Sequence, residues 1–499
     1  MAIGREATTD SKDTNAGRDF QVLSRPGELR ALAQEERLRI LHLLGGEAMT
    51  GAQVGERLGI PANRAHYHLG QLLRHGLVRE TGRGRKRWKE ERIFQATARH
   101  FVVDPALGGA RSETTDAMLR SAELAFLRWR RDEVLQFDLA SFARNLVHDC
   151  LRVGTGERVL LMFSAPALEL AEALQVELEA VQARPLVKMW SRNTIIRTLE
   201  RHSVEELAAM PFLPELDDQA LDAGIYLSTT IPQGGPPGPD LLPKLPHLME
   251  SVSRWHRSMR QRGLRYIEVS LPHLSGFAGG DLSPEQCIDV YWRSLGVDYP
   301  ELRARLDRLR AKVGSESRFS LQDGRGGSLA FDIDPKSAYL SDGIICPDDL
   351  AAGRCFDELP AGALGYLPAG RAAEGRISVE SAYIGRGHVR DLELEIHQGV
   401  LTDWKAGQGA DDLRHRLESA LGDWNVVSEL RVGANLQAAG LTGVPALDCC
   451  LSGVVTLGLG NNELLGGDVR STFGLALPMA RATLRAGDHL LVENGRLVD

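Results

Sequence analysis

Two short stretches with helical periodicity, separated by only a few residues, constrain most strongly what this chain can fold into. The first opens at Thr50–Gln53, which has the T-x-x-Q form of a capping box, and Gly59 would close it in the conformation that glycine adopts at a helix end. Pro61 lies where a first helical turn tolerates proline, and the second helix is expected to run to about His75 before Gly76 ends it. The pattern predicts two helices joined by a tight turn.

The second of these helices has one apolar and one polar face. The apolar face follows the spacing of a buried helical stripe and consists of Ala65, Leu69, Leu72 and Leu73. The opposite face carries side chains that can hydrogen-bond base edges or phosphates, namely Asn63, Arg64, His66, Tyr67 and Gln71. A short helix, a tight turn and such a polar-faced helix form the arrangement that places a recognition helix in the major groove. We therefore expect these residues to contact DNA.

A hairpin with a cationic tip is expected next. Strands are predicted at Leu77–Glu80 and Trp88–Gln95, joined by a segment whose glycines let the chain reverse. The tip carries a cluster of cations, Arg83, Arg85, Lys86 and Arg87. From residue 64 to 92 there are nine Lys and Arg against three Glu, although the whole chain has a net charge of −8. Because phosphate binding depends on local positive charge, we expect this hairpin to contact the DNA backbone.

The segments Arg37–Leu44, Ala65–Leu69 and Gly76–Val78 resemble the winged-helix domains of ArsR-type bacterial regulators. The resemblance implies a dimer that binds DNA and represses until a signal arrives. Many members of that family sense metals through cysteines on the helix-turn-helix, but no cysteine precedes Cys150, so that mode of sensing is not expected. The alternative is a winged helix used for protein contacts, which the cationic wing disfavours.

The chain of 499 residues is too long for one domain, given roughly 150 residues per domain. We expect a multidomain protein: an α+β winged helix-turn-helix, a helical connector and a two-domain α/β region. The predicted boundaries are a disordered tail at 1–20, the winged helix at 21–105, the connector at 106–150 and α/β subdomains at 151–350 and 351–499. Helical periodicity from Ser112 to Leu151 fits a dimerising connector and a plain packing helix equally well.

The remaining sequence predicts an α/β region without a membrane span. A strand at Glu157–Met162, a helix at Leu168–Ala183 and a strand at Pro185–Met189 form a β-α-β pattern, and Pro232–Pro246 is expected to be a loop. No apolar run reaches about 18 residues, and the first 19 residues lack the apolar core of a signal peptide. The six cysteines include no CxxC pair, so we interpret them as reduced thiols of a cytoplasmic protein.

Several downstream segments resemble those of the thermophilic-type metallo-aminopeptidases, the family of aminopeptidases T and S. These segments are Val153–Leu161, Asp281–Glu285, Ser328–Asp332, Phe356–Pro368, Ser428–Leu430, Ser452–Gly460 and Val492–Arg496. The resemblance implies a dimeric, two-domain α/β fold with two divalent metals in its second domain.

The sequence departs from that family at its catalytic positions. Glu429 matches one metal-binding glutamate. The family's other site residues, which are a glutamate, a histidine, a tyrosine and a final His-x-Asp pair, correspond to Ala363, Thr456, Glu463, Gly474 and Ala476. Because two bridged metals need several carboxylate and imidazole ligands, we expect no metal, no cofactor and no catalytic residue. We expect instead a pocket for a small molecule, lined by Ala363, Glu429, Thr456, Glu463 and Gly474.

Together these features predict a DNA-binding transcriptional regulator, and the ArsR-type resemblance favours a repressor. Its aminopeptidase-like region is expected to be a sensor and not an enzyme. The expected partners are a second copy of the chain, a small-molecule effector and double-stranded operator DNA, whose sites should form an inverted repeat because a dimer presents two equivalent recognition helices. Two alternatives stay open: a bifunctional DNA-binding metallo-aminopeptidase, and an aminopeptidase-like region used only for dimerisation or interaction.

Overall fold

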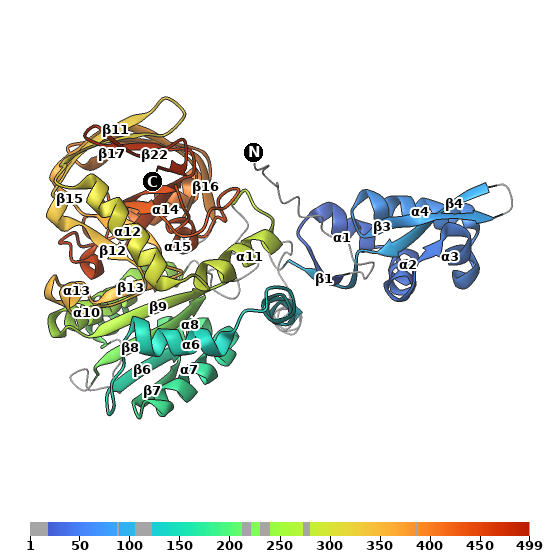
Figure 1. Cartoon of the computed structure of the whole chain (residues 1–499), viewed down its shortest axis with the longest axis horizontal. Coiled ribbons are helices and arrows are strands. Elements are labelled where there is room, and N and C mark those ends of the chain that lie inside the picture. Colours follow the sequence, from blue (N-terminus) through green and yellow to red (C-terminus); the bar gives the residue numbers. More distant parts are fainter. Residues whose placement is uncertain are drawn as a thin grey trace, which may run out of the picture. The chain divides into compact units, whose positions relative to one another are not determined.

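The protein divides into two compact units, Met1–Leu127 and Arg128–Asp499 (Figure 1). The computed structural model describes residues 18–86, 89–104, 122–211, 221–229, 240–272, 280–384 and 387–498. None of the helices in these ranges is long and apolar enough to cross a membrane.

The first unit is a helix-turn-helix with a β-hairpin. Its helices are α1 (Pro26–Leu32), α2 (Glu35–Gly46), α3 (Gly51–Leu58) and α4 (Ala62–Arg74). The strands β2 (Met49–Thr50), β4 (Lys89–Ala96) and β3 (Val78–Lys86) form one sheet in that order, and β1 (Arg18–Leu23) pairs in parallel with β5 (Ala98–Val103). Figure 1 shows β3 and β4 extending past the helices of this unit. The core contains Ile40, Leu44, Val54, Leu69, Leu72 and Phe94.

The predicted turn chemistry of the helix-turn-helix is confirmed. The Thr50 hydroxyl accepts a hydrogen bond from the Gln53 backbone N–H (3.3 Å), and the Gln53 side chain accepts one from the Thr50 N–H (2.8 Å). Gly59 ends α3 at a φ of +67°, in the left-handed region that glycine enters at little cost. The second helix ends at Arg74, close to its predicted end at about His75, and Gly76 follows at a φ of +69°.

The hairpin differs from its prediction, because its first strand is longer than expected. We expected the chain to leave the first strand after Glu80, but β3 continues to Lys86 and pairs with β4 through Arg83↔Arg92 and Lys86↔Lys89. Gly82 and Gly84 lie inside the strand, beyond a bulge between Glu80 and Gly82. The cross-strand pairing, which the composition of the segment does not reveal, keeps these glycines extended.

The second unit begins with helical segments and a parallel sheet. A helical stretch at residues 122–129, which includes the last residues of the first unit, continues into η2 (Arg130–Val134), after which α6 (Leu139–Asn145) and η3 (Leu146–Cys150) follow. The predicted connector is therefore not one continuous helix, because a new helix, α6, begins after Asp138, which caps it. Residues 105–121 lie outside the described ranges.

The parallel sheet of this unit has the strand order β13-β9-β8-β6-β7, and each strand runs parallel to its neighbours. Its strands are β6 (Arg158–Phe163), β7 (Arg184–Met189), β8 (Ala223–Thr229), β9 (Arg265–Leu271) and β13 (Phe356–Leu359).

Helices accompany these parallel strands, as the β-α-β pattern predicts. The helical segments from residue 165 to residue 351, not all of which pack on this sheet, are η4 (Ala165–Ala167), α7 (Leu168–Ala180), α8 (Arg192–Arg201), α9 (Val204–Ala209), η6 (Leu242–Lys244), α10 (Leu245–Arg262), α11 (Pro284–Leu295), α12 (Tyr299–Val313), η8 (Pro335–Ser337) and α13 (Pro347–Ala351). The prediction of a loop at 232–246 is wrong for its last residues, because α10 begins at Leu245 and has Pro246 in its first turn. The backbone N–H that proline lacks is not needed for an intrahelical hydrogen bond in the first turn. Residues 232–239 lie outside the described ranges.

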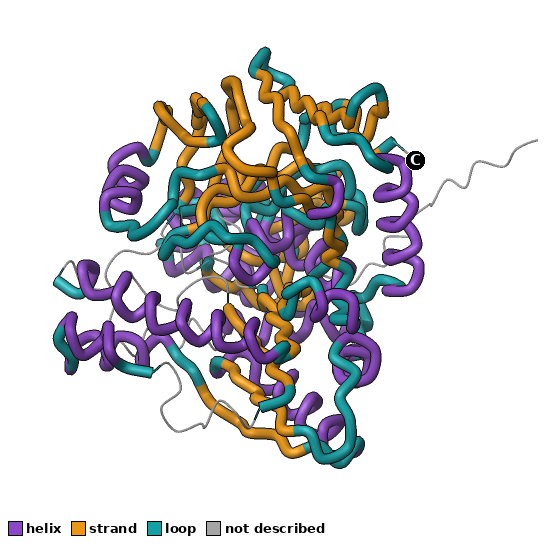
Figure 2. The backbone as a smooth tube through the Cα atoms, turned by 90° about the vertical axis from the view of Figure 1, so that its left-hand side faces the viewer, coloured by secondary structure: helices purple, strands orange, loops and turns teal. Residues whose placement is uncertain are grey.

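The rest of the second unit is built on two antiparallel sheets. An eight-stranded sheet has the order β17-β16-β15-β11-β10-β21-β22-β23, and a five-stranded sheet has the order β12-β14-β18-β19-β20. Figure 2 shows most strands gathered in the part of the unit that carries the C-terminus. The core of this part includes Phe319, Phe331, Leu364, Tyr366, Leu430 and Leu457.

The bounds of these elements complete the fold. The first sheet consists of β10 (Arg318–Gln322), β11 (Ser328–Ile333), β15 (Pro368–Tyr383), β16 (His388–His397), β17 (Val400–Gln408), β21 (Thr483–Ala486), β22 (His489–Glu493) and β23 (Arg496–Leu497). The second consists of β12 (Tyr339–Ser341), β14 (Ala363–Tyr366), β18 (Val427–Gly433), β19 (Val455–Gly460) and β20 (Gly474–Met479). Short helices α14 (Ala410–Glu418), α15 (Pro445–Asp448) and η9 (Glu463–Leu465) join the strands.

Candidate functional site

The polar face predicted on the second helix of the helix-turn-helix is the solvent-facing side of α4. Asn63, Arg64, His66 and Tyr67 are exposed and Gln71 is half-buried, with Tyr67 62% exposed. The apolar residues Ala65, Leu69 and Leu72 are buried in the unit's core. One helix therefore presents a row of hydrogen-bonding side chains on a rigid, well-packed base, which is the geometry that base reading requires.

Two of these side chains are also held by the rest of the unit. Arg64 forms an ion pair with Glu36 of α2. The His66 ring lies so close to Gly51 that a Cβ at that position would overlap the imidazole. These contacts hold the start of α4 against α2 and α3, so the side chains of Arg64 and His66 are constrained in the absence of DNA.

His68 is a residue of α4 that the sequence reasoning missed. It is 3% exposed, and neither ring nitrogen has a hydrogen-bond partner within the described part of the chain. Burial lowers its pKa, and the nearby Glu36 offsets this only in part, so the buried ring is neutral near pH 7. His68 lies three residues after Ala65 and four before Leu72, which places it on the apolar face of the helix. This spacing could have predicted from the sequence that His68 is buried.

The described cations of the hairpin are partly neutralised by neighbouring carboxylates. Arg83 contacts Glu80 (3.4 Å) and Glu90 (3.3 Å), and Arg92 lies 3.7 Å from Glu80. The side chains of Arg85 and Lys86 are not described, and Arg87 lies outside the described residues. These ion pairs lie along the described parts of the two strands.

In the second unit, most of the residues that the sequence predicts to line a pocket lie on adjacent strands. Ala363 is on β14, Glu429 on β18, Thr456 on β19 and Gly474 on β20, and these four strands are neighbours in one sheet. Ala363 and Thr456 are buried, at 2% and 1% exposed. Glu463 is on η9 and pairs instead with Arg257 (3.5 Å) and Arg470 (3.2 Å).

The carboxylate of Glu429 is hydrogen-bonded to two side chains that were not predicted from the sequence. It accepts hydrogen bonds from the Tyr339 hydroxyl and from Nε of Arg431. Tyr339 reaches it across Gly365, where a Cβ would overlap the tyrosine ring. Burial lowers the pKa of Arg431, but Glu429, Cys449 and Glu358 together raise it by more, so the net shift is upward. Residues two apart on a strand lie on the same face, so the spacing of Arg431 and Glu429 could have indicated their contact from the sequence.

A pair of divalent metals does not fit these residues. No group of three or more His, Cys, Asp and Glu side chains in the described ranges could hold a metal ion. Ala363, Gly474 and Ala476 have no side-chain donor atom, and the one matched glutamate is bound to a guanidinium. A dinuclear site needs several anionic or imidazole ligands around one point, and the guanidinium of Arg431 already holds the Glu429 carboxylate.

A second group of carboxylates comes from the parallel sheet. Glu268 of β9 and Glu358 of β13 are paired in register. The Ser270 hydroxyl donates to Glu358 (2.9 Å) and lies 3.3 Å from the Ser228 hydroxyl. Burial and the charge of Glu358 raise the pKa of Glu268 to about 7. Burial raises the pKa of Glu358 and Arg431 lowers it in part, so Arg431 interacts with carboxylates from both sheets.

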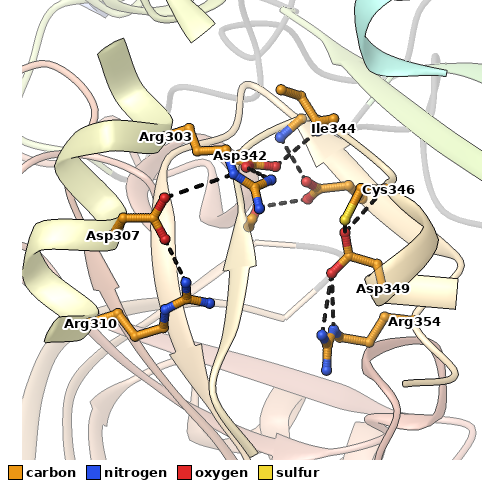
Figure 3. Close-up of polar contacts among 11 residues, drawn as sticks. Arg303, Asp307, Arg310, Asp342, Ile344, Cys346, Asp349 and Arg354 are labelled. Carbon is orange, nitrogen blue, oxygen red and sulfur yellow. Dashed lines mark hydrogen bonds and ion pairs between the residues drawn. The ribbon is translucent and has the colours of Figure 1, made fainter. Parts of the chain in front are cut away.

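A small cavity adjoins this group. Its wall includes Tyr339, Asp349, Arg354, Phe356, Glu358 and Arg431. Figure 3 shows three ion pairs in this region: Arg303 of α12 with Asp342 in the segment after β12 (2.6 Å), Arg310 with Asp307 inside α12 (2.6 Å), and Arg354 with Asp349 of α13 (3.3 Å). Arg431 and Glu358 thus line a cavity whose other charged groups are largely paired with one another.

Comparisons with known proteins agree with this two-part architecture. Residues 32–81 match the model of a helix-turn-helix domain family, whereas no curated protein matches the chain. Wild-type AmpT from Thermus thermophilus is 14% identical, with a TM-score of 0.54 over 72% of this chain and 99% of that chain. A 2,5-dihydroxypyridine dioxygenase from Pseudomonas putida KT2440 is 14% identical, with a TM-score of 0.45 over 72% and 96%. HlyU from Vibrio cholerae N16961 is 24% identical, with a TM-score of 0.13 over 19% and 85%.

The matched helix-turn-helix domain supports a DNA-binding regulator. The predicted fusion is confirmed, because this domain is joined to a large α/β region with an aminopeptidase-like fold.

Proposed function

We propose that this protein is a transcriptional regulator, most simply a repressor, whose aminopeptidase-like region senses a small molecule. In this proposal α4 enters the major groove and the tip of the hairpin contacts phosphates. The DNA contacts are assigned to Asn63, Arg64, His66, Tyr67, Gln71, Arg83, Arg85, Lys86 and Arg87. The second unit has no peptidase activity, and the protein acts as a homodimer on an inverted repeat.

The exposed polar face of α4 supports the DNA contacts. Tyr67 and Gln71 make no side-chain hydrogen bond within the described ranges that would have to be broken on binding, whereas Arg64 must exchange or share its partner Glu36. Base edges are read by such side chains, and each good pair contributes about 1–3 kcal/mol of discrimination. The wing supplies the sequence-independent part of the affinity through phosphate contacts.

The contact between Arg431 and Glu429 is the observation that carries the proposed loss of enzyme activity. A metal at Glu429 would have to displace the guanidinium or share the carboxylate with it, and two cations in one enclosed place repel each other strongly. The same region can still recognise a small molecule in this proposal, since concave sites with a few directed polar groups serve for recognition as well as for catalysis.

A sensor region of this kind would act through the dimer. If the effector binds one arrangement of the two copies more tightly, a larger fraction of the dimers adopts that arrangement and its distance between the two recognition helices. The affinity for an operator with fixed half-site spacing changes accordingly.

The proposal is tested by selecting bound fragments from a genomic DNA library with the full-length protein, followed by footprinting. We expect protection of two half-sites in inverted orientation, separated by one or more helical turns, and a dimer in solution. A single protected half-site with monomeric protein would contradict the dimer.

The enzyme alternative is tested on the same preparation. Amino-acid amides are incubated with protein loaded with zinc, cobalt or manganese, and the metal content is measured by elemental analysis. We expect neither stoichiometric metal nor turnover. Two bound metals per chain, or hydrolysis that Glu429→Gln abolishes, would replace the sensor by a bifunctional enzyme.

A further inference from the structure

We infer that Glu36 of α2 is a positioning residue for Arg64 of α4, and that the guanidinium it holds reads a guanine in the operator half-site. This inference rests on the proposed function, in which α4 enters the major groove. It goes further because it names a base that the protein recognises and a residue outside α4 on which that recognition depends.

Glu36 is held in place by the helix that carries it. It lies in the first turn of α2, four residues before Ile40, whose side chain is 0% exposed. Residues four apart on a helix lie on one side, so Glu36 is on the side of α2 that packs into the unit, and its side chain is only 27% exposed. A carboxylate in a first turn is also stabilised by the helix dipole. The fold therefore restrains the carboxylate that Arg64 contacts.

Arg64 lies at the end of α4 that a recognition helix directs at the bases. It belongs to the first turn of α4, and the N-terminal residues of such helices contact base edges. Its side chain is 55% exposed, although its Nη2 donates a hydrogen bond to Oε1 of Glu36. A long exposed side chain loses conformational freedom when it binds a partner. The contact with Glu36 imposes part of that restriction before DNA is bound.

The guanidinium of Arg64 keeps enough donors for a base after it has bound Glu36. Among the described residues, its Nε and Nη1 have no hydrogen-bond partner, and the bond from Nη2 to Glu36 uses one of the two hydrogens of Nη2. The other hydrogen can act together with the N–H of Nε or of Nη1 as a complete two-bond edge. Guanine presents two acceptors, O6 and N7, in the major groove, and an arginine edge binds both. Guanine is therefore the base that fits this side chain.

The charge of Glu36 favours a base over a phosphate as the partner of Arg64. A phosphate would be attracted by the guanidinium but repelled by the carboxylate beside it. A guanine edge has no net charge, so its binding depends mainly on the direction of the hydrogen bonds. His68 does not neutralise Glu36, because burial lowers the pKa of its ring more than Glu36 raises it. Arg64 thus remains the cation that the Glu36 carboxylate contacts.

A second ion pair in the same unit provides a matched control. Arg57 of α3 lies 2.9 Å from Glu47, and the two side chains are 60% and 55% exposed. Neither residue belongs to α4. Replacing Glu47 therefore releases an exposed arginine of the first unit and leaves the contact between Glu36 and Arg64 in place.

The test measures the guanine preference of the full-length protein, defined as the dissociation constant for a duplex with one guanine replaced by adenine divided by that for the selected operator. All values are taken at one fixed salt concentration. We expect one guanine in each half-site with a preference of about 5- to 150-fold, and Arg64→Met should abolish it. Arg64→Lys keeps the charge but lacks the paired N–H groups, so it should lose most of the preference and keep the affinity for scrambled DNA.

Glu36→Gln distinguishes positioning from a purely structural role. It should lower the guanine preference about 5-fold or more without weakening the binding of scrambled DNA. The freed Arg64 can then reach a phosphate, which steepens the slope of log K against log salt by up to about 0.9. A residue needed only for folding would instead weaken binding to every sequence.

Two further variants complete the comparison. In the Arg64→Met background, Glu36→Gln should not change the guanine preference further, because it acts through Arg64. Glu47→Gln should keep the full preference. If Glu36→Gln fails to fold, Glu36→Asp, whose carboxylate is one methylene shorter, takes its place and should lower the preference in the same way. An undiminished preference in the Glu36 variant that folds, or an equal loss in Glu47→Gln, would overturn the inference.

The same measurements separate this inference from the function on which it rests. A selected operator in which no guanine depends on Arg64 overturns the inference and leaves the regulator function standing. Binding without any sequence preference, or no binding to DNA, contradicts the regulator function itself, and the inference falls with it.

Discussion

Arg431 donates a hydrogen bond through Nε to the carboxylate of Glu429, and the two side chains are only 19% and 11% exposed. The partners are two residues apart on β18, so the strand itself holds them on one face. An enclosed pair of this kind differs from a surface salt bridge because neither ion can fall back on water when the other is removed.

The effects of removing the two partners of this pair should therefore not be additive. Glu429→Gln or Arg431→Met alone should cost about 3–5 kcal/mol in the free energy of unfolding, the usual penalty for a buried charge that loses its partner. The double variant should cost less than the sum of the two. Urea unfolding of the three variants measures this coupling, and strictly additive losses would show that the two side chains do not depend on each other.

The capping box at the start of α3 predicts a selective effect of one hydroxyl. Thr50→Ala removes the acceptor for the Gln53 N–H and should cost about 1 kcal/mol of stability, whereas Thr50→Ser keeps the oxygen and should cost less. Thermal unfolding of the two variants gives the comparison. Equal melting temperatures for the alanine and serine variants would mean that the cap does not stabilise α3.

The paired carboxylates Glu268 and Glu358 predict a dependence of stability on pH. The pKa of Glu268 is raised from 4.5 to about 7 in the folded protein, by burial and by Glu358, so between these values the folded state holds a proton that the unfolded chain has lost. The contribution of Glu268 to stability is therefore present below about pH 4.5 and is lost as the pH rises to about 7. Glu268→Gln should flatten this fall in urea unfolding measured across the range, and a profile parallel to that of the unaltered protein would refute the assignment.

The tip of the hairpin predicts a change in the salt dependence of DNA binding. Replacing Arg85, Lys86 and Arg87 by alanine should weaken binding to all sequences and flatten the slope of log K against log salt by about 0.9 per lost phosphate contact. The control is Arg197→Ala with Arg201→Ala, which removes exposed cations from α8 in the other unit. An unchanged slope for the tip variant would remove the wing from the DNA interface.

The parts of this protein that the sequence predicts are those governed by local rules. The cap at Thr50, the left-handed Gly59 and the two faces of α4 follow from spacing along one helix, and the structure confirms them. The Arg431–Glu429 contact and the Glu268–Glu358 pair depend on which strands are neighbours, and this register is set by distant segments. The extension of β3 to Lys86 likewise depends on its pairing with β4. Local patterns do not carry that information.

The central claim is that α4 reads DNA sequence, and the most direct measurement of it is a specificity ratio. This is the dissociation constant for a scrambled duplex divided by that for the selected operator, measured at one fixed salt concentration. Tyr67→Ala and Gln71→Ala should each lower this ratio by about 1–3 kcal/mol, or roughly 5- to 150-fold, and leave the affinity for scrambled DNA nearly unchanged. Arg197→Ala in the other unit should change neither value. A ratio that stays the same in both α4 variants, with the protein folded, would contradict the account.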